Sequence, residues 1–455
     1  MYADRDRLAR LFEEELARYA EARPESKRLW EAGREHLPDG VPMLWMAKWP
    51  GPWPPYVVSA AGAHFECADG IDHVDLCLGD TGAMVGHAPE KSVAAITAQL
   101  RRGSTFMLPT ADAAAAAGLL AERFGLPRWQ FTLSATDANR HVLRYARQAT
   151  GRDRVLVIDF CYHGTVDEAY ATLDDEGRVV SRRGNIGPPV DPATTTVVVA
   201  FNDVPAILAA LAAREIAAVL IEPALTNIGI VLPEPGWHEA VRAACDETGT
   251  VLVIDETHTL CAGPGGMTAR DGLRPDVVVV GKTIGGGIPA AAWGMTDELA
   301  DRVSESLNWG GEGREDLDVG GVGGTLAGNA LSMAGIRATL GEVLTPEVYP
   351  GMIERAREWT EGVQAAIDEF GAPWQVTQLG CRAEYSFRPT PPRDGREAAD
   401  ADDFELQQYL HLHALNRGIL ITPFHNMALM CPSTTSDDVA RHTVAFREAV
   451  ASLYD

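Results

Sequence analysis

Short apolar runs alternate with longer amphipathic segments through the middle of the chain. Six of the runs have the length and the valine and isoleucine content of buried strands, and they cover residues 131–133, 155–158, 196–201, 217–221, 250–254 and 277–280. A further strand is expected at 290–295, and helical patterns lie between most of the strands, at 137–150, 204–214 and 236–248. This alternation predicts an α/β domain with a mainly parallel, seven-stranded sheet. Ligands of such sheets bind beyond the carboxyl ends of the strands.

The segments before residue 131 carry mixed patterns. They predict helices at 4–22, 24–36, 91–102 and 111–124, and a hairpin over 57–78 about a turn at 68–70. Residues 38–56 are rich in proline and contain Trp45, Trp49 and Trp53, so no regular helix or central strand is expected there. This stretch is either a loop packed over the body or an aromatic wall of a binding site, and the two interpretations are even.

A different organisation follows residue 320. Helices are expected at 326–344, 346–370 and 436–453, strands at 375–378, 382–387 and 418–422, and a polar loop at 389–403. We therefore predict an N-terminal segment over 1–85, a large domain over 86–330, and a smaller α+β domain over 331–455. The N-terminal segment is expected to join the smaller domain in space.

Composition excludes several classes of partner. The 455 residues carry a formal net charge of -25, which argues against nucleic acid and against an anionic membrane surface. The seven cysteines are scattered and contain no C-x-x-C pair, so we expect reduced, mostly buried thiols and no metal site. No signal peptide and no apolar run of membrane-spanning length is present. We expect a soluble, cytoplasmic protein.

Lysine is rare in this chain, and one lysine has an unusual place. The four lysines are Lys27, Lys48, Lys91 and Lys282, and Lys282 follows the apolar strand 277–280 directly. Taken alone, such a lysine is more often a side chain that snorkels past a strand end. Burial would instead make its amine a usable nucleophile or base.

Asp255 follows another buried strand, at 250–254. It is either a cap for the next turn or a carboxylate that fixes the protonation of a ligand nitrogen. If both strands belong to one sheet, Asp255 and Lys282 face one cleft. A pyridoxal phosphate site needs this pair, because the lysine forms the Schiff base and the acid keeps the pyridine nitrogen protonated.

The other requirements of that cofactor also have candidates at strand ends. Small and hydroxyl residues from Ser134 to Thr136 open a helix and could bind a phosphate through free N–H groups, although a plain helix cap is more common and Asp137 counts against anion contact. Tyr162 could stack on the ring and His163 could orient it, although both are more often packing residues. Further candidates are Glu222, after the strand 217–221, and Thr325, in a glycine-rich turn.

The ordered motifs resemble those of the class III aminotransferases, which are fold-type I pyridoxal phosphate enzymes. The motifs are Ser-Ala-Thr-Asp-Ala-Asn from 134, Tyr-His-Gly from 162, Ile-Glu-Pro from 221, Val-Ile-Asp-Glu-Thr from 253, Gly-Lys-Thr-Ile-Gly-Gly-Gly from 281, and Gly-Gly-Thr-Leu-Ala-Gly-Asn from 323. The resemblance spans nearly the whole chain. It is closest to the branch of glutamate-1-semialdehyde aminomutase and the β-amino acid transaminases.

The resemblance implies roles for individual residues. Lys282 would be the Schiff-base lysine and Asp255 the partner of the pyridine nitrogen. The remaining cofactor-binding residues would be Ser134, Ala135, Thr136, Tyr162, His163, Glu222, His258 and Thr325. Thr325 would reach the phosphate of a neighbouring subunit's cofactor, which implies a homodimer with active sites at the subunit interface.

Two features depart from the family pattern. Ala135 and Asp137 replace the glycine and glutamate of the usual phosphate loop. Members that bind a carboxylate use an arginine in the stretch matching 38–50 or just after residue 423, and this chain has none in either. The absence points to an apolar substrate pocket, for which the candidates are Trp45, Met46, Trp53, Tyr162 and Phe424.

We therefore expect a transaminase that moves an amino group from a primary amine, apolar or aryl-bearing, or from an amino acid, to a keto acid or aldehyde. A keto-acid acceptor carries a carboxylate, which would need a cation in the protein. Arg382 and Arg388 are candidates for this cation. The interpretation of both as ordinary surface arginines is at least as strong. The alternatives are an intramolecular aminomutase of the glutamate-1-semialdehyde type and a β-amino acid transaminase. A cofactor-binding protein without catalysis is a further rival, against which the pair of Lys282 and Asp255 argues.

Overall fold

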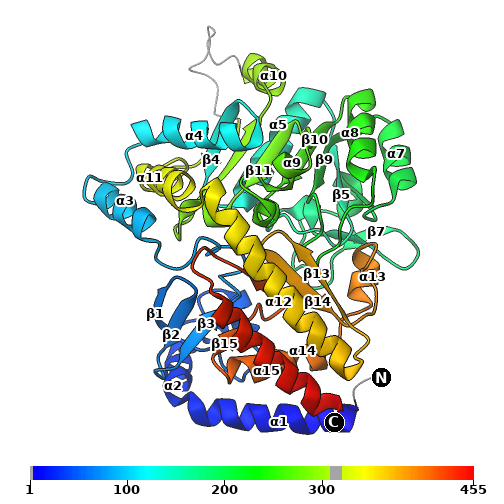
Figure 1. The fold of residues 1–455 in the computed structure, drawn as a ribbon. Helices are drawn as coiled ribbons and strands as arrows, with labels where there is room; N and C mark the ends of the chain where they lie inside the picture. Colours follow the sequence, from blue (N-terminus) through cyan, green and yellow to red (C-terminus); the bar gives the residue numbers. More distant parts are fainter. Residues whose placement is uncertain (1–3, 308–319, 455) are drawn as a thin grey trace. The chain divides into compact units, whose positions relative to one another are not determined.

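The computed structural model describes residues 4–307 and 320–454, and the chain divides into two compact units (Figure 1). The large unit comprises Glu90–Pro346 and Pro392–Ala398. The small unit comprises Met1–Pro89, Glu347–Pro391 and Ala399–Asp455. The large unit extends past residue 330 because helix α11 (Ala330–Ala338) packs against α3 (Glu90–Leu100) and α4 (Ala111–Phe124).

The large unit is built on a seven-stranded sheet, which confirms the expected fold class. Its order is β4-β12-β11-β10-β9-β5-β8. The strands are β4 (Arg128–Thr132), β5 (Arg154–Ile158), β8 (Thr196–Val199), β9 (Ile216–Ile221), β10 (Val251–Asp255), β11 (Val277–Val280) and β12 (Ala291–Met295). Only β12 runs antiparallel to its neighbours β11 and β4, and the other pairs are parallel. The buried valine-rich and isoleucine-rich strands are typical of a sheet covered on both faces.

Helices of the large unit cover this sheet (Figure 1). α5 (Ala135–Thr150) packs against β9, β11 and β12, and α10 (Asp297–Leu307) packs against α5. α7 (Val204–Ala212) and α8 (Trp237–Thr248) pack against each other and against β8 and β10 respectively. The fully buried Trp293 of β12 contacts the ring of Tyr145 on α5 edge-on at 6.2 Å. This contact fixes α5, whose first turn carries residues of the predicted site.

The small unit combines N-terminal and C-terminal segments of the chain. One sheet has the order β1-β2-β3-β15, and its strands are β1 (Val57–Ala61), β2 (His64–Cys67), β3 (Asp72–Asp75) and β15 (Ile419–Leu420). A second sheet contains β13 (Gln375–Leu379), β14 (Arg382–Ser386) and β16 (Met427–Leu429). The helices are α1 (Arg5–Ala22), α2 (Pro24–Gly33), α12 (Tyr349–Phe370), α14 (Phe404–Leu415) and α15 (Ser436–Tyr454). Figure 1 shows α1 beside α14 and α15, which it contacts.

Three local expectations were wrong. The helix expected at 326–344 begins only at Ala330, because the Asn329 side chain accepts a hydrogen bond from the Ser332 N–H and caps it. The stretch 57–78 forms three strands, since Gly62, with φ 58°, adds a second turn. The loop expected at 389–403 contains α13 (Gly395–Ala399).

All seven cysteines lie in the described part of the chain, and each is buried there. No helix among residues 4–307 and 320–454 is long and apolar enough to span a membrane.

Candidate active site

Lys282 stands just beyond the end of an apolar strand. β11 ends at Val280, Gly281 follows, and Lys282 opens a short 3-10 turn (Lys282–Gly285) with φ 53°. A left-handed backbone costs a residue with a side chain about 1–2 kcal/mol, so the surrounding fold must hold it. The Nζ of Lys282 lies 2.8 Å from Nε2 of His258. The amine is therefore held at the carboxyl edge of the sheet.

Asp255 is buried at the same edge, one strand away. It is the last residue of β10 and pairs with Val279 of the parallel neighbour β11. Because both strands end together, the Asp255 carboxylate and the Lys282 amine belong to one edge of one sheet. The two groups are brought to the same edge by strand pairing, although 27 positions separate them in the sequence.

The Asp255 carboxylate is held as an anion by three donors. Its Oδ2 accepts from Nδ2 of Asn139 at 2.8 Å and from Nδ1 of His163 at 3.1 Å, and its Oδ1 accepts from the Thr257 N–H at 3.0 Å. Burial acts to raise the pKa of Asp255, but the hydrogen bond and charge of His163 outweigh it and hold that pKa below its usual range. A dry, ionised carboxylate of this kind can keep a ligand nitrogen protonated.

His163 is the cationic partner of this carboxylate. Burial acts to lower the pKa of His163, while the neighbouring Cys161 and Asp255 raise it to about 10. The charged imidazole is fully buried, so it orients Asp255 rather than contacting solvent. The structure thus gives His163 a role behind the carboxylate, whereas the sequence suggested that it orients the ring.

Asn139 completes this arrangement and was not singled out from the sequence. Its Nδ2 donates to the Asp255 carboxylate and also, at 3.2 Å, to the His163 carbonyl. The available signal was its position, since residue 139 lies one turn after Ala135 on the same face of α5.

The start of α5 forms a cradle beside Gly281. Ser134 caps the helix, because its Oγ accepts from the Asp137 N–H at 3.2 Å and donates to the Asp137 carboxylate at 2.9 Å. The N–H groups of Ala135 and Thr136 have no partner inside the helix and remain for an anion. The Asp137 carboxylate, which seemed unfavourable for phosphate from sequence, is engaged with its own cap.

Two glycines keep the cradle open. A Cβ added at Gly281 would lie 3.1 Å from the Ala135 Cβ, and one added at Gly164 would lie 2.1 Å from Oγ1 of Thr136. Thr136 Oγ1 also accepts from the Thr165 N–H at 3.0 Å. The strand end of Lys282, the Tyr-His-Gly segment and the α5 N-terminus therefore meet at one place.

Glu222 supports the backbone at Tyr162. It is buried, its Oε1 accepts from the Tyr162 N–H at 3.0 Å, and the Thr226 hydroxyl donates to its Oε2. Burial raises the pKa of Glu222 above its usual range. The partly buried Tyr162 ring contacts Tyr170 edge-on at 6.4 Å. Glu222 thus positions the segment that carries the expected stacking residue.

Thr325 lies in an exposed glycine-rich turn, where the Gly323 N–H donates to Nε2 of His141 at 3.4 Å. Its expected contact with a neighbouring subunit's cofactor stays a prediction.

The substrate-pocket candidates, apart from Tyr162, belong to the small unit. The exposed Trp45 contacts the ring of Phe424 at 4.9 Å and lies beside the exposed Met46 in a 3-10 turn (Leu44–Ala47). Trp53 is instead a core residue of the small unit, since it packs on Tyr19 and its indole N–H donates to a backbone carbonyl. The packing interpretation of residues 38–56 therefore fits Trp53, and the aromatic-wall interpretation stays open for Trp45 and Met46.

Arg382 is not a surface residue. It is fully buried in β14, and its Nη2 lies 3.7 Å from the Glu384 carboxylate. This charge has an acidic neighbour within its own unit, which weakens its case as the cation for a substrate carboxylate. Arg388 also lies in the small unit, and its role as the cation for a substrate carboxylate stays a prediction.

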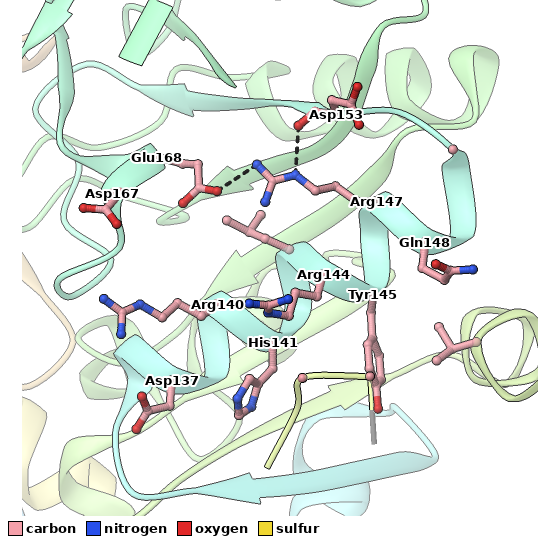
Figure 2. Close-up of a pocket in the computed structure, with 15 residues that line it drawn as sticks. Asp137, Arg140, His141, Arg144, Tyr145, Arg147, Gln148, Asp153, Asp167 and Glu168 are labelled. Carbon is pink, nitrogen blue, oxygen red and sulfur yellow. Dashed lines mark hydrogen bonds and ion pairs between the residues drawn. The ribbon is translucent and has the colours of Figure 1, made fainter. Parts of the chain in front are cut away.

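A separate cavity of about 780 Å³ lies against α5. Figure 2 shows Arg140, Arg144 and Arg147 projecting from this helix, with Arg147 bound to Glu168 at 2.7 Å and to the Asp153 carbonyl at 2.8 Å. Acidic residues also line the cavity, and they are Asp137, Asp153, Asp167 and Glu168. The mixed charge does not favour an anion, and the catalytic candidates at the strand edge do not line this cavity.

The large unit fits a pyridoxal phosphate group by its own geometry. It offers a lysine amine at a strand end, an ionised carboxylate on the neighbouring strand, and a helix N-terminus opened by two glycines. Amine, ring nitrogen and phosphate each have a counterpart in this donor set.

Comparison with known proteins agrees with this geometry. The model of the family described as Aminotransferase class-III matches residues 45–449. The chain is similar to a glutamate-1-semialdehyde 2,1-aminomutase from Anaeromyxobacter dehalogenans (strain 2CP-1 / ATCC BAA-258), with 31% identity over 434 residues, 94% of this chain and 97% of that protein.

Solved structures are similar over the full length. A glutamate-1-semialdehyde-aminomutase from Pseudomonas aeruginosa PAO1 has 46% identity and a TM-score of 0.97, with 100% of both chains covered. A lysine-to-alanine variant of that protein was solved in complex with PMP. A β-phenylalanine aminotransferase from Variovorax paradoxus has 26% identity and a TM-score of 0.85 over 98% of this chain and 97% of that one.

Proposed function

The chain belongs to the class-III aminotransferase family, whose members use pyridoxal 5′-phosphate, and from that membership we propose that it is a transaminase. The enzyme would move an amino group from a primary amine, apolar or aryl-bearing, or from an amino acid, to a keto acid or aldehyde. The observation that carries the proposal is that Lys282 and the ionised Asp255 lie at the carboxyl ends of two neighbouring strands, Lys282 just beyond β11 and Asp255 at the end of β10.

Three parts of the large unit would hold the cofactor. The N–H groups of Ala135 and Thr136 would bind the phosphate, and Asp255 would keep a proton on the ring nitrogen. When bound, pyridoxal phosphate supplies an aldehyde that joins to amines and a ring that accepts electrons. His163 keeps Asp255 ionised and oriented, because it donates from Nδ1 and carries a positive charge.

Lys282 would act twice in the proposed reaction. Its Nζ first links the cofactor to the protein. Once released, Nζ would take a proton from the substrate carbon that bears the amino group and would deliver it to the cofactor carbon that derives from the aldehyde.

The amino-acid sequence supports an apolar amine as the donor. No arginine lies in residues 38–50 or in the stretch of Thr422 to His425, where carboxylate-binding members of the resembled branch carry one. Those stretches hold Met43, Trp45 and Phe424 instead. A bidentate arginine is the usual partner of a carboxylate, so its absence supports a substrate without one near the reacting carbon.

An aminomutase is the second candidate, because the chain shares 46% identity with a solved protein described as a glutamate-1-semialdehyde-aminomutase. Such an enzyme moves the amino group within one molecule. The two candidates differ in one observable, the release of a carbonyl product from an external donor.

The deciding experiment gives the cofactor-loaded protein a panel of amines with pyruvate. A transaminase will bleach the visible cofactor band on adding a donor and will form alanine together with the carbonyl product of that donor. Isomerisation of a diamino or amino-aldehyde substrate with no carbonyl released would favour the aminomutase.

Lys282→Ala is expected to abolish turnover, with a loss of at least about 10⁴-fold, because both nucleophile and base are removed. Turnover and donor-dependent bleaching are measured side by side, with Lys91→Ala, a lysine on helix α3, as the matched control. Full turnover by Lys282→Ala would disprove the central assignment.

A further inference from the structure

The Lys282 amine has a neighbour that the proposed chemistry does not yet use. Nε2 of His258 lies 2.8 Å from Nζ, which is hydrogen-bond distance. A lysine ammonium has donors only, so a charged Lys282 requires the lone pair of a neutral His258 at this distance. A neutral Lys282 would instead accept from the Nε2–H of His258. One proton therefore lies between the two nitrogens in either case.

The turn that carries His258 is rigid. Asp255 begins it at the end of β10, and the buried Glu256 anchors it inside the protein. The Glu256 carboxylate accepts from the Thr259 hydroxyl at 2.5 Å and from the Met267 and Thr268 N–H groups at 3.1 and 2.5 Å. A Cβ at Gly266 would lie 2.2 Å from that carboxylate, so this packing is tight. The imidazole is thus offered to Lys282 from a fixed backbone.

The side chain of Lys282, by contrast, is flexible. A lysine side chain carries about 2 kcal/mol of rotamer entropy along its four-carbon stem. Under the proposed function the amine is released from the cofactor in every cycle, and then only its surroundings hold it. A fixed imidazole nitrogen at 2.8 Å keeps the free amine near the place where it must act.

We propose that His258 is a positioning residue that holds the free Lys282 amine through Nε2 while the amine is released from the cofactor. This role rests on the proposed function of Lys282 as the reacting amine. The step attributed to His258 makes or breaks no covalent bond to carbon, and it consists of a hydrogen bond along which one proton is shared between Nζ and Nε2.

Two substitutions differ in the atom they preserve. The side-chain amide of glutamine can place a polar atom where Nε2 of histidine lies, whereas that of asparagine reaches only the place of Nδ1. His258→Gln should therefore keep the contact with Lys282, and His258→Asn should lose it. His238→Gln is the matched control, because the Nε2 of His238 bonds to the Pro223 carbonyl at 2.9 Å on a different part of the large unit.

The first readout uses the cofactor-free protein. Pyridoxal phosphate is added, and the appearance of the visible band gives the rate at which Lys282 captures it. His258→Asn should capture about tenfold more slowly than the unchanged protein, while His258→Gln and His238→Gln should stay within about threefold, since general positioning effects are of this order or larger. Melting temperatures of all variants verify that the comparison is between folded proteins.

The second readout is steady-state turnover with whichever amine the protein accepts. His258→Asn should lower kcat by about 10–100-fold with KM changed by less than about threefold, because the donor still binds but the released amine is no longer held. Equal capture rates and equal kcat for the asparagine and glutamine variants would overturn the role. An equal loss of capture rate and kcat in both variants would also overturn the role of His258, because the loss would then come from removing the imidazole ring and not from losing the contact with Nζ.

The two proposals fail in different ways. If no amine is a donor but the unchanged protein captures pyridoxal phosphate, the transaminase proposal fails and the capture rates still decide the role of His258. If the unchanged protein forms no visible band, the role of His258 falls together with that of Lys282.

Discussion

Among single residues, the buried pair of His163 and Asp255 determines the charge state of the site. Each partner is buried, and each keeps its charge because the other lies 3.1 Å away. Removing one partner of a buried pair leaves an uncompensated charge, which is costly. The pair also makes the stability of the folded protein depend on pH. The buried His163 keeps its proton at pH values at which an exposed histidine would release it.

The sign of this linkage follows from the pKa of His163, which is raised to about 10 in the folded protein. An exposed histidine titrates near about 6.5, so between these values the folded state binds more protons than the unfolded state. The stabilisation is complete below about pH 6.5 and falls as the pH rises toward 10.

His163→Asn should flatten this dependence, because the asparagine amide can donate to Asp255 from the place of Nδ1 but carries no titrating charge. Urea unfolding of the cofactor-free protein at pH 7 and pH 9.5 measures the effect. The unchanged protein should lose stability between the two values, and the variant should lose less. An equal loss in both proteins would contradict the assigned charge of His163.

Residue identity drew attention to Lys282 and Asp255 more readily than to the residues that contact them. Lys282 and Asp255 stand out because their types are unexpected after buried strands. The support by Asn139 and the core packing of Trp53 could not be found this way, since both depend on how distant segments meet. A tryptophan in a proline-rich stretch has the same sequence signal whether it packs inward or faces a ligand.

At the scale of elements, the close approach of β11 to α5 limits the size of the proposed phosphate cradle. Gly281 precedes Lys282, and a Cβ there would lie 3.1 Å from the Ala135 Cβ and 3.2 Å from the Ala291 Cβ. Both distances are tighter than ordinary contact, so α5 would have to shift away from the strand. The alanine at 135, which departs from the family pattern, is accommodated because residue 281 is glycine.

Gly281→Ala should therefore destabilise the protein by about 1–3 kcal/mol and weaken pyridoxal phosphate binding. Adding Ala135→Gly should recover part of both losses, because one of the two close contacts disappears. Thermal unfolding measures the stability, and equilibrium dialysis measures the binding of the cofactor. Both are measured for the unchanged protein, the two single variants and the double variant, which form a double-mutant cycle. Strictly additive effects would contradict the contact between the two elements.

Element types and order follow well from the hydrophobic pattern, because valine-rich runs and amphipathic helices each have a characteristic period. The end of a helix is less predictable. Asn329 delays the start of α11 through a side-chain bond to the Ser332 N–H, and a polar cap competes with helical periodicity that continues on both sides of it. The order of strands in the sheet depends on long-range pairing and was not predicted.

At the scale of the whole molecule, an exposed apolar segment of the large unit indicates association. Phe106, Met107 and Leu108 are 43%, 75% and 72% exposed and adjacent in sequence. Apolar groups clustered on a surface mark interaction sites more often than scattered ones do. This segment is a candidate interface for the homodimer expected from Thr325, and that homodimer stays a prediction.

If the expected homodimer forms through this segment, the combined substitution Met107→Asp and Leu108→Asp should convert it to a monomer with weakened cofactor retention. Light scattering coupled to size-exclusion chromatography measures the mass. Ile186→Asp is the control, since Ile186 is 90% exposed in the same unit but far from this segment in the sequence. A monomeric unchanged protein, or a variant that stays dimeric, would contradict the assignment.

The joining of the two chain ends in one sheet has a consequence for synthesis on the ribosome. β3 is complete once residue 75 is made, but its parallel neighbour β15 spans Ile419–Leu420. All seven strands of the large sheet, by contrast, lie between residues 128 and 295. Long-range parallel pairing forms late because loop closure must precede it. The sheet that carries Lys282 can therefore assemble during translation, while the N-terminal strands wait for β15.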